Sequence, residues 1–150
     1  MLDWSLKWAE KEPNNASAWG SIGIAYYQLE RYLDAVEYYQ KSLKINPDNA
    51  NIWHALGRTY NKLKRYPDAA EAYQKSLKIS PDDTEILYNL GLSYFLSGNT
   101  KEAMNVIEKL RNLDAEKANI LSNYFNSIPK YKTNIETDNN ISSAIKIKGF

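Results

Sequence analysis

The chain contains no cysteine, so neither disulfides nor thiol chemistry are available to it. Its only histidine, His54, has no clustered carboxylates near it in the sequence that would complete a metal or catalytic site. The formal net charge of +1 gives no electrostatic case for nucleic acid or an anionic membrane. No apolar run approaches the roughly 18 residues of a membrane-spanning helix. We therefore expect a non-enzymatic chain without cofactor or metal. The start, Met1-Leu2-Asp3-Trp4, lacks the pattern of a signal peptide, which favours a cytoplasmic location.

What the chain does contain is a repeat with a period of 34 residues. The segment that begins at Trp19 returns from Trp53 and again from Leu87. Further positions of the pattern recur in register: Ala35, Tyr39 and Pro47 in the first copy, Ala69, Tyr73 and Pro81 in the second, and Ala103 and Ile107 in the third, where Ala115 replaces the proline. A period of this size is typical of a solenoid, in which each unit is too small to bury its own apolar face and stacks on its neighbours.

The order of these residues resembles the tetratricopeptide-repeat (TPR) family over about residues 1–128. The resemblance implies an all-α, right-handed solenoid built from antiparallel pairs of helices. The predicted units are an N-terminal half-unit over 1–13, three repeats over 16–49, 50–83 and 84–117, a C-terminal capping helix over 118–128, and a polar tail over 129–150.

Glycine recurs in the middle of the first helix of each unit, at Gly23, Gly57 and Gly91. Glycine costs roughly 1 kcal/mol relative to alanine at such a position, so a repeated glycine needs a packing reason. We expect the second helix of each unit to approach closely there. Phe125 stands where the next glycine would be, and we expect its ring to block a further helix and end the array.

The first helix of the chain carries more apolar surface than one neighbour can cover. Trp4 and Trp8 share one of its faces, while Leu6 and Ala9 share another, which can pack on the helix of Trp19. Two interpretations remain open. The helix is either a cap folded over the first unit, or its tryptophans meet another subunit, as in a homodimer, or the rest of a longer chain.

The last segment, 129–150, is polar as far as Asn140 and then regains Ile145, Ile147 and Phe150 among lysines. It is either a solvated tail or a linear motif. Its apolar end could occupy the binding groove of its own or a neighbouring molecule.

In the TPR family, partners bind in a concave groove lined by first-helix positions that are offset from the packing stripe. The resemblance therefore implies that the partner-binding residues are Ser17, Ser21, Ile24, Tyr27, Gln28, Asn51, His54, Arg58, Asn61, Lys62, Tyr88, Asn89, Leu92 and Phe95. Their spacing places them on one helical face, and they are not needed to hold each pair together. We expect Arg58 and Lys62 to hold an acidic or carbonyl-rich stretch of the partner. Tyr88, Leu92 and Phe95 should hold an apolar side chain.

Some family members hold the acidic C-terminus of heat-shock chaperones through lysine, asparagine and arginine at five groove positions. The matching positions here hold Gly20, Ile24, Ala55, Glu85 and Asn89, and none agrees, so we do not expect chaperone-tail binding. We predict a non-catalytic protein–protein interaction scaffold that holds a peptide or helix of a partner. The alternatives are a substrate-recruiting module of a larger enzyme or signalling protein, and a self-associating assembly protein.

Overall fold

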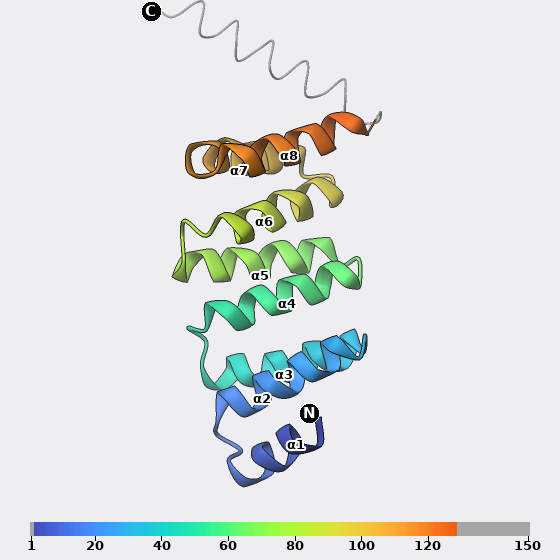
Figure 1. Cartoon of the computed structure of the whole chain (residues 1–150), viewed down its shortest axis with the longest axis vertical. Coiled ribbons are helices and arrows are strands. Elements are labelled where there is room, and N and C mark those ends of the chain that lie inside the picture. Colours follow the sequence, from blue (N-terminus) through green and yellow to red (C-terminus); the bar gives the residue numbers. More distant parts are fainter. Residues whose placement is uncertain (1, 129–150) are drawn as a thin grey trace, which may run out of the picture.

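The computed structural model describes residues 2–128, which form eight α-helices and no strand. The helices are α1 (Leu2–Lys11), α2 (Ala16–Gln28), α3 (Tyr32–Ile45), α4 (Ala50–Lys62), α5 (Tyr66–Ile79), α6 (Thr84–Leu96), α7 (Thr100–Leu113) and α8 (Ala115–Ser127). Figure 1 shows them stacked in a single row, with α1 at one end and α8 at the other. The predicted all-α solenoid is therefore confirmed. The predicted tail of residues 129–150, with Ile145, Ile147 and Phe150, lies outside the described residues. None of the described helices is long and apolar enough to span a membrane.

The two helices of each unit are joined by the same tight turn. Its middle residue is Glu30, Lys64 or Gly98, with φ of 58°, 57° and 85°. The next backbone N–H donates back to a tyrosine carbonyl of the first helix, at 2.9, 2.9 and 2.8 Å in the three turns. This is the left-handed helix ending that glycine adopts most easily. The third turn is therefore relaxed, whereas Glu30 and Lys64 hold a conformation that costs a residue with a side chain about 1 kcal/mol or more.

The first helix of each unit begins at a side-chain cap. Asn49 accepts a hydrogen bond from the backbone N–H of Ile52 at 3.2 Å, and Asp83 accepts from two backbone N–H groups of α6. These two caps confirm the prediction that the turns around the prolines start the next helix. The indole N–H of Trp53 also donates to the carbonyl of Pro47 at 2.7 Å, which anchors α4 to the preceding turn.

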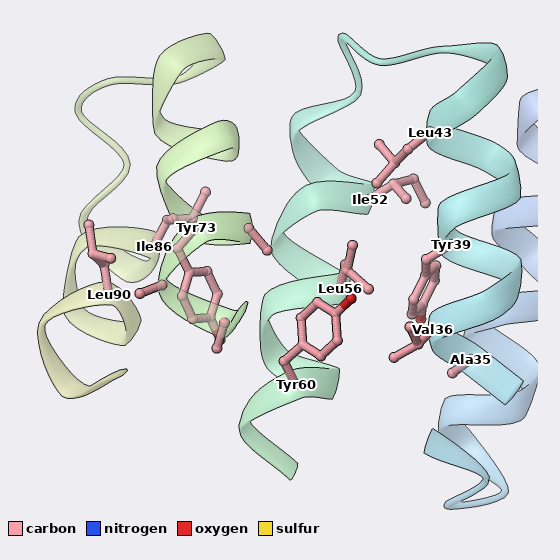
Figure 2. Packing of buried hydrophobic residues seen from close by; sticks show 13 residues of the cluster. Ala35, Val36, Tyr39, Leu43, Ile52, Leu56, Tyr60, Tyr73, Ile86 and Leu90 are labelled. Carbon is pink, nitrogen blue, oxygen red and sulfur yellow. The ribbon is translucent and has the colours of Figure 1, made fainter. Parts of the chain in front are cut away.

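The mid-helix glycines let two tyrosine rings pack against helix backbone. A Cβ atom on Gly23 would lie 2.6 Å from Cδ1 of Tyr39, and one on Gly57 would lie 2.6 Å from Cε1 of Tyr73. The predicted close approach is therefore confirmed at both positions. Both tyrosines belong to one buried cluster that runs from α3 to α6, and Figure 2 shows its side chains directed into the spaces between successive helices.

The last described helix, α8, packs differently from the other first helices. Phe125 is fully buried, and its ring stacks on that of Phe95 in α6 with centroids 3.7 Å apart. The expectation that Phe125 blocks a following helix is therefore wrong, because its ring faces α6. Ile120 and Tyr124 are instead 51% and 43% exposed, although the residues 34 positions earlier, Ile86 and Leu90, are buried. We conclude that α8 is rotated about its axis, so that its large aromatic ring fills the core.

Candidate partner-binding face

The predicted binding residues lie on α2, α4 and α6, and the surface that they form is called here the first-helix face. On α2, Ser17 and Gln28 are exposed and Ile24 is 42% exposed. Ser21 is half-buried because its hydroxyl donates to the carbonyl of Ser17 at 2.9 Å. Tyr27 is half-buried as well, at the C-terminal end of the helix. This part of the face therefore offers one accessible aliphatic side chain beside small polar groups.

The α4 part of the face carries its positive charge. Arg58 and Lys62 are exposed, as is Asn51 at the start of the helix. The Arg58 guanidinium lies over the ring of Tyr27, with its carbon 5.6 Å from the ring centroid. This cation–π contact joins the second unit to the first and holds the charge at a defined place on the face.

Hydrogen bonds fix the joint between the second and third units. The amide of Asn61 donates to the hydroxyl of Tyr73 at 3.2 Å, and its carbonyl oxygen accepts from the hydroxyl of Ser93 at 3.0 Å. One helical turn or two away, Nδ2 of Asn89 lies 3.4 Å from Nε2 of His54. The structure thus brings three predicted residues, His54, Asn61 and Asn89, together across the joint. Such bonds limit how far α4 and α6 can move apart.

The electrostatic surroundings of His54 keep its imidazole neutral. Burial lowers the pKa of His54 below its ordinary value of 6.5; the Glu85 carboxylate acts in the opposite direction, and Arg58 lowers the pKa further. At neutral pH, Nε2 is therefore available as an acceptor for the amide of Asn89. The described residues contain no group of three side chains able to hold a metal ion.

The α6 part of the face is more apolar. Tyr88 and Leu92 are half-buried and keep part of their surface accessible. Phe95, however, is fully buried in the stack with Phe125, so the prediction that it contacts a partner is wrong. Its place in the repeat register gave no sign of this, because in the other units the corresponding residues, Asn61 and Tyr27, reach the surface.

Sequence reasoning assigned Tyr39 and Tyr73 to packing alone. Their rings are indeed buried, but the hydroxyl of Tyr73 bonds to Asn61 on the first-helix face. Ser93, which was not predicted as a site residue, completes the same network. The available signal was the use of tyrosine rather than phenylalanine at a packing position, since a buried hydroxyl needs a polar partner.

The N-terminal tryptophans form a separate patch. Trp4 is 63% exposed, Trp8 is half-buried, and their ring centroids lie 5.1 Å apart. The opposite side of α1 packs on α2 through the buried Ala9. Trp4 stands 34 residues before Tyr38, whose ring in α3 stacks on rings of α2. In α1, Trp4 occupies the position of such a ring without a first helix to cover it.

The comparisons with known proteins agree with this architecture. A crystal structure of MamA protein is similar with a TM-score of 0.71 and 24% sequence identity, over 79% of this chain and 64% of that one. A MamA RS-1 ArsTM double mutant has a TM-score of 0.73 and 28% identity, over 77% and 65% of the two chains. The chain thus spans just under two thirds of the length of these proteins. No curated protein sequence matches it.

The model of the family described as tetratricopeptide repeat matches residues 14–82 and, one unit further along, residues 48–116. Together the two matches span the helix pairs α2–α3, α4–α5 and α6–α7. The match extends over more than half of the chain, which therefore belongs to the tetratricopeptide-repeat family.

Proposed function

We propose that the protein is a non-catalytic interaction scaffold whose first-helix face binds a peptide or short helix of a protein partner. The observation that supports this most directly is that the face is held in shape before any partner arrives. His54 and Asn61 are hydrogen-bonded to α6, and Arg58 is held over a ring of α2. A preorganised surface loses less side-chain entropy on binding, so more of the contact energy appears as affinity.

The face also offers the mixture of groups that recognition requires. Ile24 and Leu92 present aliphatic surface, and Arg58 presents charge between them along the row of helices. None of the three is needed for the contact between the two helices of its own unit. In such surfaces a few side chains usually carry most of the binding energy, surrounded by contacts that exclude water.

Selection of random decapeptides by display on the immobilised full chain tests this proposal. The selected peptides are then measured by calorimetry against wild type, Ile24→Ser and, as a matched control, Leu33→Ser. Leu33 is 69% exposed on α3, outside the first-helix face. We expect Ile24→Ser to weaken binding about tenfold, as the loss of one buried aliphatic side chain does, and Leu33→Ser to leave it unchanged. The reverse pattern would place the binding site on the second helices.

A second candidate function is self-association through the N-terminal patch of Trp4 and Trp8. The exposure of Trp4 favours it, because few soluble surfaces leave a tryptophan uncovered next to another aromatic ring. At the other end, α8 has turned Phe125 into its own chain, so the two ends are not complementary. We therefore propose that copies pair through two N-terminal patches in a closed dimer rather than head to tail.

A further inference from the structure

Arg58 differs from every other arginine of the chain in its partners. The other three each pair with an acidic residue of their own helix or turn: Arg31 with Asp34 at 2.8 Å, Arg65 with Asp68 at 2.8 Å, and Arg111 with Glu108 at 2.9 Å. Among the residues that the structure describes, Arg58 forms no ion pair. A guanidinium presents several N–H donors in a planar fork, and here they are directed to no carboxylate.

Tyrosine hydroxyls surround this guanidinium. Tyr27 lies under it, and Tyr39 and Tyr73 feel its charge: burial raises the pKa of Tyr39 to about 12, Tyr27 raises it further, and Arg58 lowers it. Burial raises the pKa of Tyr73 as well, against the opposing effect of Arg58. All three tyrosines therefore remain protonated and able to donate at neutral pH.

Two of these hydroxyls have a free proton to give. The hydroxyl of Tyr73 accepts from Asn61, which leaves its own hydrogen available. The hydroxyl of Tyr39 has no hydrogen-bond partner within residues 2–128, yet no buried side-chain polar atom in that range lacks one. The Tyr39 hydroxyl must therefore reach the surface, although its ring is buried. The site collects donors and supplies no acceptor for them.

We propose that Arg58, together with the hydroxyls of Tyr27, Tyr39 and Tyr73, forms a receptor for one carboxylate group of the bound peptide. This inference rests on the proposed function and specifies the chemistry of its ligand. A carboxylate fits because it only accepts, and two oxygens match the guanidinium fork while the remaining lone pairs meet the hydroxyls. The receptor lies outside the five positions of the family's chaperone clamp, which hold residues such as Gly20 and Ala55 here.

The face contains one carboxylate of its own, that of Glu85, and its place argues for the same assignment. Glu85 acts electrostatically on His54 and Tyr73, on the α6 side of the joint, and forms no ion pair with Arg58. A ligand carboxylate is therefore expected on the α2 side, close to Ile24. Since Ile24 is exposed there, the residue next to the acidic group should be apolar.

The test uses the random decapeptides selected on the full-length chain. We expect an aspartate, a glutamate or a free C-terminus to be enriched at one position, beside an apolar residue. Arg58→Gln should weaken binding of such a peptide about tenfold or more, as loss of a charge-assisted hydrogen bond does. Tyr39→Phe, which removes only the hydroxyl, should weaken it about threefold, and the control Lys62→Gln should have little effect.

The outcomes separate this inference from the function on which it rests. Selected peptides without any enriched acidic group, or binding that is unchanged in Arg58→Gln, would overturn the carboxylate receptor while the scaffold function stands. Failure to select any peptide would overturn both. Competition decides the class of anion: acetate should displace the peptide at lower concentration than inorganic phosphate, and the opposite order would contradict a carboxylate site.

Discussion

Replacing Gly57 with leucine should unfold the array at a lower temperature, because the site has no room for a side chain. A Cβ atom there would lie 2.6, 2.8 and 2.9 Å from three ring atoms of Tyr73, whereas carbon atoms in contact normally lie about 3.5–4.0 Å apart. The ring would have to retreat by roughly 1 Å. It cannot do so freely, because it is fully buried and its hydroxyl is bound to Asn61.

The magnitude follows from two opposing effects. A residue other than glycine gains about 1 kcal/mol of helix propensity, and overpacking a core typically costs about 1–3 kcal/mol. Gly57→Ala should therefore be destabilising by about 1 kcal/mol, and Gly57→Leu, with three more carbon atoms, by about 3 kcal/mol. The larger value corresponds to a fall in melting temperature of about 10 °C. Neighbouring units share interfaces, so the whole array should melt together.

Thermal melting followed by circular dichroism measures this effect, and two controls isolate its cause. In Gly91→Ala, the new Cβ would meet the flexible end of Leu121 at 2.8 Å, so stability should change little. Adding Tyr73→Leu to Gly57→Ala should recover stability relative to the sum of the single changes. A Gly57→Leu protein that melts within a degree or two of wild type would refute the packing argument.

Four further predictions follow from the structure. Glu30→Gly should raise the free energy of unfolding in urea by up to about 1 kcal/mol, since φ there is 58°; a loss of stability would show that the turn is not strained. Phe95→Ala should lower it by about 3–5 kcal/mol, because the ring is fully buried against Phe125; a change that affected only binding would return Phe95 to the first-helix face. Sedimentation should show a dimer that Trp4→Ala with Trp8→Ser converts to a monomer, whereas a concentration-independent monomer of the wild type would rule out pairing. Lowering the pH from 7.5 to 5.5 should reduce the free energy of unfolding more in wild type than in His54→Gln, because the unfolded chain, with the higher histidine pKa, binds the proton first; equal slopes would contradict the assignment of His54.

The fold could be predicted from the sequence because the repeat states each requirement three times. The glycine–tyrosine contacts at Gly23 and Gly57 follow from residue types that must meet at a fixed distance along the chain. The caps at Asn49 and Asp83 are local and depend on a few neighbouring residues. Local and periodic signals therefore sufficed for the helices and for their pairing.

The end of the array and the polar contacts of the face could not be predicted in this way. Repeat register placed Phe95 at the surface and Phe125 at a blocking position, but the two rings stack on each other because α8 rotates to bury them. That rotation depends on the volume available between α6 and α7, which no spacing in the sequence records. The bonds of Asn61 and His54 to α6 depend in the same way on the angle between neighbouring units.

Binding at the first-helix face is the central claim, and site-specific photo-crosslinking tests it most directly. Benzoylphenylalanine is placed at Gln28, which is exposed on α2, or at Glu71, which is exposed on α5, and a selected decapeptide is added before irradiation. We predict that the peptide crosslinks from position 28 and not from position 71. Crosslinking from position 71 alone, or equally from both, would contradict the account.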